Sequence, residues 1–191
     1  MQPGPHPGFN KNVFINCPFD GKYNHILRPI LFTIIHLGFT PQIASQIADS
    51  GEQRINKILS LILKSKYSIH DLSRIRSEKR GELFRLNMPF ELGIDYGCRV
   101  TSTGHLKRKR FLVLAAKPHD YKKALSDLAG IDAKSHGNNP EKAGLAIRNW
   151  FVDVHLKQRQ AQALSGKGLS SFTTISILKE KGMGFPHKIL K

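Results

Sequence analysis

Short, nearly continuous apolar runs recur along the chain, and such runs are typical of strands buried on both faces of a parallel sheet. Four runs predict strands: Asn12–Pro18, Phe39–Ala44, Lys66–Arg74 and Phe111–Ala116. The third run ends in polar residues, so its strand is expected to carry His70, Asp71 and Ser73 to its carboxyl end. The charged stretch 74–82 behind it lacks apolar periodicity and is expected to form a mobile loop.

Between these runs, apolar residues recur at the spacing of amphipathic helices. The first predicted helix spans Tyr23–Leu37, with Pro29 in its first turn and Gly38 just past its end. A capping box formed by Ser50 and Gln53 is expected to begin the second helix. The predicted buried face of the second helix consists of Ile55, Ile58, Leu59 and Ile62.

A third helix is predicted to begin at Met88 or Pro89, because proline restrains the residue before it and is tolerated in a first turn. Glu91 would then lie in the first turn, where the helix macrodipole favours the ionised carboxylate. Gly93 and Gly97 lie on the same helix and weaken it. Their presence predicts that a ligand or a packed strand approaches the helix closely.

The alternation of strands and helices predicts an α/β fold with a central parallel sheet covered on both faces. A last helix is predicted after Asn139 and Pro140, with a buried face of Ala143, Ala146, Ile147, Trp150 and Val154. One α/β domain is expected over residues 11–158, after a flexible arm at 1–10. The remaining residues, 159–191, form a C-terminal extension in which one short helix is expected near Ser171–Lys181.

Ligands of open parallel sheets bind beyond the carboxyl ends of the strands. The segments Asn16–Asp20 and Asp71–Arg74 follow two of the predicted strands, and the helix that carries Glu91 begins close by in sequence. The three segments are therefore expected to meet at one edge of the sheet. His70 precedes Asp71 on a strand, so the two side chains point to opposite faces, and His70 is expected in the core or behind the site.

The chain is strongly basic, with 30 Lys and Arg against 14 Asp and Glu and a formal net charge of +16. This balance makes a polyanionic partner or an anionic ligand plausible, although a solvated basic surface is an equally good reading of it. The basic tract His105–Arg110 precedes the strand at Phe111 and is expected on the opposite side of the sheet from the site. There it would serve an acidic or nucleic-acid partner.

Cys17 and Cys98 are the only cysteines and form no CxxC pair, which argues against a disulfide framework or a zinc site and favours a reducing cytoplasm. Both are expected to be small buried apolar residues. The longest apolar run is far shorter than the roughly 20 residues of a membrane span, so no membrane partner is expected. The sequence also lacks the GxSxG, GxGxxG and GxxxxGK[ST] motifs of hydrolase elbows, dinucleotide folds and P-loops.

Three motifs occur in order: VFINCPFD at 13–20, IHDLSR at 69–74 and NMPFELG at 87–93. With them the chain resembles, over Lys11–Phe151, the superfamily of nucleoside 2-deoxyribosyltransferases and TIR-type NAD-cleaving domains, and more narrowly a bacterial TIR-like group. The resemblance implies a flavodoxin-like, TIR-like three-layer sandwich. It departs from the TIR pattern at Pro89 and Phe90, where a tryptophan-cysteine pair is common, and this leaves the substrate open between NAD and a free nucleoside.

The resemblance also implies roles for individual residues. Glu91 matches the carboxylate that cleaves an N-glycosidic bond, and Asp71 matches the aspartate that contacts the ribose or the base. The implied nucleotide-binding residues are Asn16, Pro18, Phe19, Asp20, Asp71, Ser73, Arg74, Asn87 and Phe90. Arg74, Arg76 and Arg85 are candidates for bidentate contacts to a pyrophosphate, although Arg76 fits a solvated loop slightly better.

The leading hypothesis is an N-glycosidase that hydrolyses or cyclises NAD, with NAD as substrate and no other cofactor. Some relatives make nucleotide signals from NAD in antiphage defence, and the resemblance extends that expectation to this chain. The alternatives are a non-catalytic module that senses a nucleotide or assembles with further copies of itself, and a nucleoside deoxyribosyltransferase. A nucleic-acid-binding protein ranks last, because no recognition motif accompanies the positive charge.

Overall fold

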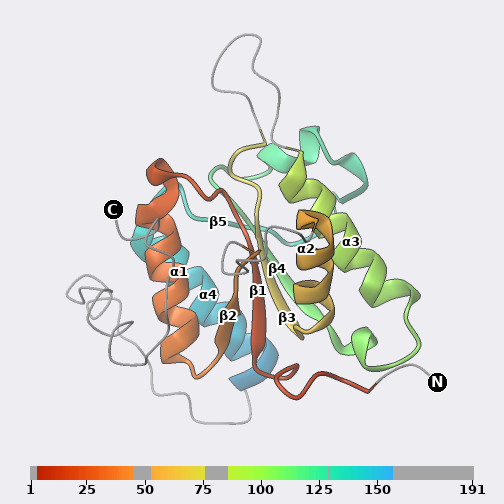
Figure 1. The fold of residues 1–191 in the computed structure, drawn as a ribbon. Coiled ribbons are helices and arrows are strands. Elements are labelled where there is room, and N and C mark those ends of the chain that lie inside the picture. The colour runs from red at the N-terminus through yellow and green to blue at the C-terminus, as the bar shows by residue number, and fades with distance from the viewer. Residues whose placement is uncertain (1–3, 45–52, 76–85, 129, 157–191) are drawn as a thin grey trace.

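Five parallel strands form the central sheet, in the order β2-β1-β3-β4-β5 (Figure 1). The computed structural model describes residues 4–44, 53–75, 86–128 and 130–156. The strands are β1 (Asn12–Asn16), β2 (Thr40–Gln42), β3 (Tyr67–Asp71), β4 (Arg110–Ala115) and β5 (Lys134–Ser135). The first four confirm the predicted strands, whereas β5 has only two polar residues and left no apolar signal in the sequence.

Helices cover both faces of this sheet (Figure 1). The pair α1 (Asn24–His36) and α4 (Pro140–Phe151) packs on one face, and α2 (Arg54–Leu63) and α3 (Asn87–Thr101) lie on the other. The shorter helices are η1 (Gly21–Tyr23), η3 (His105–Arg108), η4 (Asp120–Lys123), η5 (Ser126–Leu128) and the π-helix η6 (Val152–Leu156). The predicted three-layer, flavodoxin-like sandwich is thereby confirmed.

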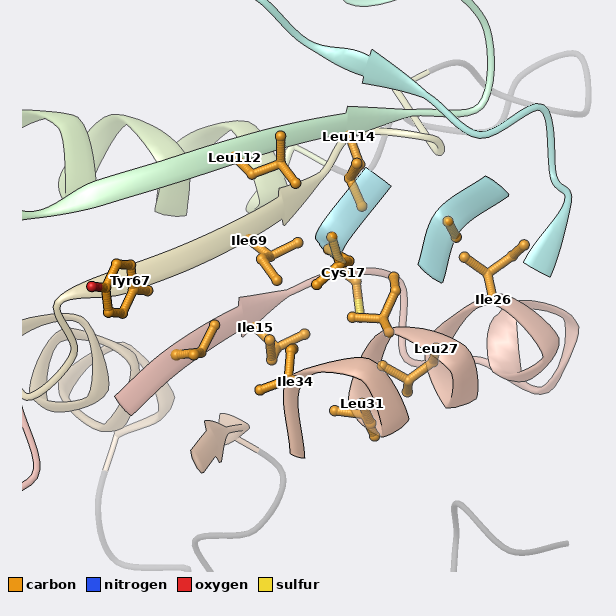
Figure 2. Packing of buried hydrophobic residues seen from close by; sticks show 14 of the residues in the cluster. Ile15, Cys17, Ile26, Leu27, Leu31, Ile34, Tyr67, Ile69, Leu112 and Leu114 are labelled. Atoms are coloured by element: carbon orange, nitrogen blue, oxygen red, sulfur yellow. The ribbon is translucent and has the colours of Figure 1, made fainter. Parts of the chain in front are cut away.

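The main core lies between the sheet and the α1–α4 layer (Figure 2). All residues of β1 and β3 are buried, as expected for interior strands of a covered parallel sheet. Figure 2 shows Ile15, Ile69 and Leu112 pointing from neighbouring strands toward the α1 side chains. Phe9 is also fully buried and its carbonyl accepts a hydrogen bond from the Lys66 N–H (3.0 Å), so the chain is already anchored inside the segment predicted as an arm.

The start of α1 differs from the prediction. Asp20 accepts a hydrogen bond from the Tyr23 N–H (3.0 Å), which begins η1 and leads directly into a helix that starts at Asn24. Pro29 therefore lies inside α1 and not in its first turn. The end of α1 is as predicted, because Gly38 has a φ of 82° and its N–H donates to the Ile35 carbonyl (2.9 Å).

The predicted capping box of α2 is wrong in its assignment of Gln53, which occupies the N-cap position without a capping side-chain hydrogen bond. Ser50 lies outside the described residues. The buried face of α2 is Lys57, Ile58, Leu61 and Ile62. Ile55 and Leu59, predicted to be buried, are each 38% exposed, because Ile58, Leu61 and Ile62 are the α2 residues that pack with Phe14 of β1.

A Cβ placed on Gly93 or Gly97 would find no atom within 4 Å, so the prediction that a strand packs against these glycines is wrong among the described residues. The alternative, that a ligand approaches them, stays a prediction. In the last helix, Asn139 caps α4 as predicted by accepting from the Lys142 N–H (2.9 Å). Val154, however, is 36% exposed, because the chain passes from α4 into η6 before it.

Within the described ranges, none of the helices has the length and apolar character required to cross a bilayer. The C-terminal extension, residues 159–191, lies outside the described residues.

Candidate active site at the carboxyl edge of the sheet

Asn16 joins the three segments that the sequence predicted to meet. It is the last residue of β1, and its amide Nδ2 donates to the Met88 carbonyl in the first turn of α3 (2.9 Å). The same nitrogen lies 3.0 Å from Nδ1 of His70 on β3. Because Asn16 is almost fully buried, these bonds hold the start of α3 against the carboxyl ends of β1 and β3. The predicted convergence is confirmed.

Glu91 is 6% exposed and lies on the face of α3 that packs toward the sheet. Burial raises the pKa of its carboxyl from 4.5 to about 7, and the positive charge of Arg54 on α2 lowers it only in part. The expectation of a readily ionised first-turn carboxylate is therefore wrong. The helix begins at Asn87, which puts Glu91 at its fifth residue, too far inside for the macrodipole to offset burial.

Three carboxylates surround the turn after β1. Burial raises the pKa of the Cys17 thiol, and the negative charges of Asp71, Glu91 and Asp20 each raise it further. A thiol in this setting stays protonated, which confirms Cys17 as a buried apolar residue and excludes it as a nucleophile. Figure 2 shows its side chain among the core residues of β1 and α1. Tyr23 donates to both Asp20 and Asp71, and Asn16 donates to Met88 at the start of α3, so the segments of the three carboxylates meet here.

Asp71 is fully buried, and its carboxylate is contacted by two side chains and one backbone N–H. The Tyr23 hydroxyl donates to its Oδ2, His136 Nε2 lies 2.9 Å from the same oxygen, and the Ser73 N–H donates to Oδ1 (2.8 Å). Burial alone would raise the pKa of Asp71, but the hydrogen bonds from His136, Ser73 and Tyr23 hold it below its ordinary value. The carboxylate thus fixes the positions of the three groups around it.

His136 follows β5 and was missed from the sequence, because a two-residue strand leaves no apolar run to mark its carboxyl end. Its Nδ1 accepts from the Asn138 N–H (3.1 Å), so the ring proton is assigned to Nε2, which faces Asp71. The Ser73 hydroxyl lies 3.0 Å from that same Nε2. A nitrogen that already carries a proton cannot take one from Ser73, so this group is not a nucleophile–base pair.

The other predicted site residues divide into buried and exposed groups. Pro18 is buried and Phe19 packs against the main core, so both shape the turn after β1. Asp20 and Arg74 form an ion pair (3.3 Å) that is partly open to solvent. Asn87 and Phe90 are exposed at the start of α3, Phe90 to 60%. Arg76 and Arg85 lie outside the described residues.

A second buried polar group lies behind the site. His70 Nε2 is 3.0 Å from Asp95 Oδ2, and Lys109 Nζ is 3.0 Å from Asp95 Oδ1, with all three side chains fully buried. Burial alone would raise the pKa of Asp95, but His70 and Lys109 hold it below its ordinary value. His70 is therefore in the core, as expected, and connects Asn16 to an ion pair that the sequence did not indicate.

Comparison with known proteins finds no match for this chain among family models, curated proteins or solved structures. Among the described residues, no group of three or more His, Cys, Asp and Glu side chains is arranged to hold a metal ion.

Proposed function

We propose that this protein cleaves the N-glycosidic bond of NAD or a related nucleotide, with Glu91 as the catalytic carboxylate. The observation that carries the proposal is a nearly inaccessible carboxyl group with a pKa of about 7, at the edge of a parallel sheet where ligands bind. Carboxyl groups with strongly shifted pKa values cluster at functional sites. Asp20 and Asp71, which surround the same turn, come from the other two motifs.

The reaction suits a buried carboxylate. As the bond between the ribose and nicotinamide breaks, its electron pair leaves with the nicotinamide, which departs neutral, and positive charge develops at the anomeric carbon. Ionised Glu91 in a poorly hydrated site would stabilise that charge far better than an exposed carboxylate. A water molecule, or a hydroxyl of the nucleotide itself, then forms the new bond to the anomeric carbon and loses its proton to solvent.

The surrounding residues would bind and orient the nucleotide. Phe90 and Asn87 are exposed beside Glu91, where an aromatic ring and an amide can contact a base and its substituents. Arg74, held by Asp20, ends the second motif and suits a phosphate. Asp71 is proposed as a positioning residue, because its carboxylate has no exposed surface and is shared by Tyr23, Ser73 and His136.

The direct test is to incubate the pure full-length chain with NAD and to separate the products by chromatography. Release of nicotinamide supports the proposal. Exchange of the base of a 2′-deoxynucleoside, with NAD left intact, would instead support the deoxyribosyltransferase. Binding of NAD without turnover, at both low and high protein concentration, would support a sensing or assembly module.

The rate of nicotinamide release is expected to rise with pH and to level off above about 7, because Glu91 must lose its proton to act. A plot of kcat/KM against pH reports the pKa of the free enzyme and is the measurement to make. A profile that falls as the pH rises through 7 would contradict this role, since it would require Glu91 to act as a proton donor.

Asp71→Asn is expected to reduce nicotinamide release by about 10-fold, less than the loss of the catalytic carboxylate, and to act more on KM than on kcat. The reason is that the variant loosens His136 and the Ser73 turn without touching the reacting atoms. Steady-state kinetics separate the two constants. A complete loss of kcat with unchanged KM would instead place Asp71 in the chemical step.

A further inference from the structure

Six cationic side chains lie at the amino ends of the strands, whereas Glu91 lies at their carboxyl ends. Lys11 precedes β1, Lys64 and Lys66 connect α2 to β3, and the rest belong to η3 and the first residue of β4. We define this basal cationic surface as Lys11, Lys64, Lys66, Lys107, Arg108 and Arg110. The strand register places Tyr67, next to Lys66, between Val13 of β1 and Arg110 of β4, so the three segments are neighbours in space as well.

Three cations of this surface, Lys66, Arg108 and Arg110, are close enough to repel one another. Burial lowers the pKa of Lys66, and the positive charges of Arg108 and Arg110 lower it further. The Lys66 ammonium lies 5.2 Å from the centre of the Tyr67 ring, and the Arg108 guanidinium lies 6.0 Å from the centre of the Phe9 ring. Because both rings are fully buried, their contacts hold Lys66 and Arg108 close to the protein surface.

Among the described residues, little negative charge offsets this surface. Most described carboxylates lie at the carboxyl edge, between β4 and β5, or at the start of α4: Asp20, Asp71, Glu91, Asp120, Asp127, Asp132 and Glu141. The other two are Asp95, which is buried against Lys109 and His70, and Asp153, which follows α4 and has its own contacts. Mutual repulsion that few described acids offset favours the binding of an outside anion.

Not every cation of the basic tract His105–Arg110 lies at the surface. Lys109 was expected at the surface with its neighbours, but it is completely buried in the ion pair with Asp95. Lys107, Arg108 and Arg110 on either side of it are exposed. The basal cationic surface therefore excludes Lys109 and includes Lys11, Lys64 and Lys66 from other parts of the sequence.

We propose that the basal cationic surface binds nucleic acid through its phosphates, independently of the carboxyl-edge site. The evenly spaced charges of a nucleic-acid backbone complement cations that come from three separate segments at one end of the sheet. Phe9 and Tyr67, the aromatic rings beneath the cations, are buried and cannot stack on bases or enter a bilayer. Binding is therefore expected to depend on salt and to show little sequence preference.

The test is fluorescence anisotropy of a labelled 20-base-pair DNA with the full chain at several salt concentrations. The basal variant is Lys64→Ser, Lys107→Ser and Arg108→Ser. The matched control is Lys117→Ser, Lys122→Ser and Lys123→Ser, which removes the same charge from the segment after β4 at the other end of the sheet. Thermal melting verifies that both variants fold, and Lys109 is left intact in each.

The basal variant is expected to bind DNA about 10²-fold more weakly at 0.15 M salt, and the slope of log K against log salt is expected to fall by about 2.7. The control variant is expected to change the affinity by less than about 10-fold. Equal losses in the two variants would overturn the proposal in favour of general charge attraction. Binding to polyglutamate or to anionic lipid vesicles, with none to DNA, would overturn it in favour of an acidic protein or a membrane.

Discussion

Glu91→Gln is expected to lower the rate of nicotinamide release by about 10² to 10³-fold while leaving the fold intact. Glutamine keeps the shape of the side chain and its place on α3 but cannot carry the negative charge that opposes the charge at the anomeric carbon. The loss of one preorganised electrostatic group in a buried site is worth about 3–4 kcal/mol in the transition state. Steady-state release of nicotinamide by the wild type and the variant measures it.

The same substitution is expected to stabilise the protein at high pH. The folded-state pKa of Glu91, about 7, lies above its ordinary value of 4.5, so the folded chain holds the proton more tightly than the unfolded chain. The free energy of unfolding of the wild type therefore falls as pH rises from about 4.5 to 7. The Gln variant lacks this loss and should be more stable by about 1–3 kcal/mol at pH 8. Urea unfolding at pH 4.5 and pH 8 measures the difference.

Glu141→Gln is the matched control, because Glu141 is an exposed acid in the first turn of α4. It should leave the rate unchanged and lower the stability by less than about 1 kcal/mol, since its carboxylate favours the helix dipole. Activity in Glu91→Gln equal to that of the wild type would remove Glu91 from the chemistry. Loss of activity together with loss of stability at pH 8 would mean that Glu91 is an ordinary structural residue.

The strands and the meeting of three motifs could be predicted because they depend on local patterns. Apolar runs such as Asn12–Asn16 mark strands that are buried on both faces, and chain topology alone brings their carboxyl ends together. Asn16, Asp71 and Glu91 could therefore be assigned to one edge. What the pattern did not contain was the depth of burial, which decides that Glu91 has a raised pKa and that Asp71 is closed off from solvent.

The missed residues depend on contacts between distant parts of the chain. His136 reaches Asp71 from a segment 65 residues later, and its strand is too short to leave a periodic signal. Ile58 and Ile62 are buried in α2 as predicted, but the other half of the predicted face was wrong for a related reason. Ile55 and Leu59 fit an amphipathic stripe as well as Leu61 does, and only the packing of α2 on the sheet decides which of them is covered.

Lys107 and Lys109 belong to the same basic tract, but Lys107 is exposed and Lys109 is completely buried. The second large effect is therefore expected at Lys109. Lys109→Met is expected to lower the free energy of unfolding by about 3–5 kcal/mol, because it leaves the buried carboxylate of Asp95 without its cation. Lys109 also donates to the Ile62 carbonyl (2.7 Å) and to the Ser65 carbonyl at the end of α2, and both lose that partner. Urea unfolding at pH 7 measures the loss.

Lys107→Met is the control and should change the stability by less than about 0.5 kcal/mol, because Lys107 is exposed. The double variant Lys109→Met and Asp95→Asn tests the cause. Asparagine can still accept from His70 Nε2 but carries no charge, so the double variant should recover part of the stability lost in Lys109→Met. Equal stability of Lys109→Met and Lys107→Met would show that the Asp95 charge needs no partner. If Asp95→Asn added its own loss in full, the two residues would act separately and the buried ion pair would contribute nothing to the stability.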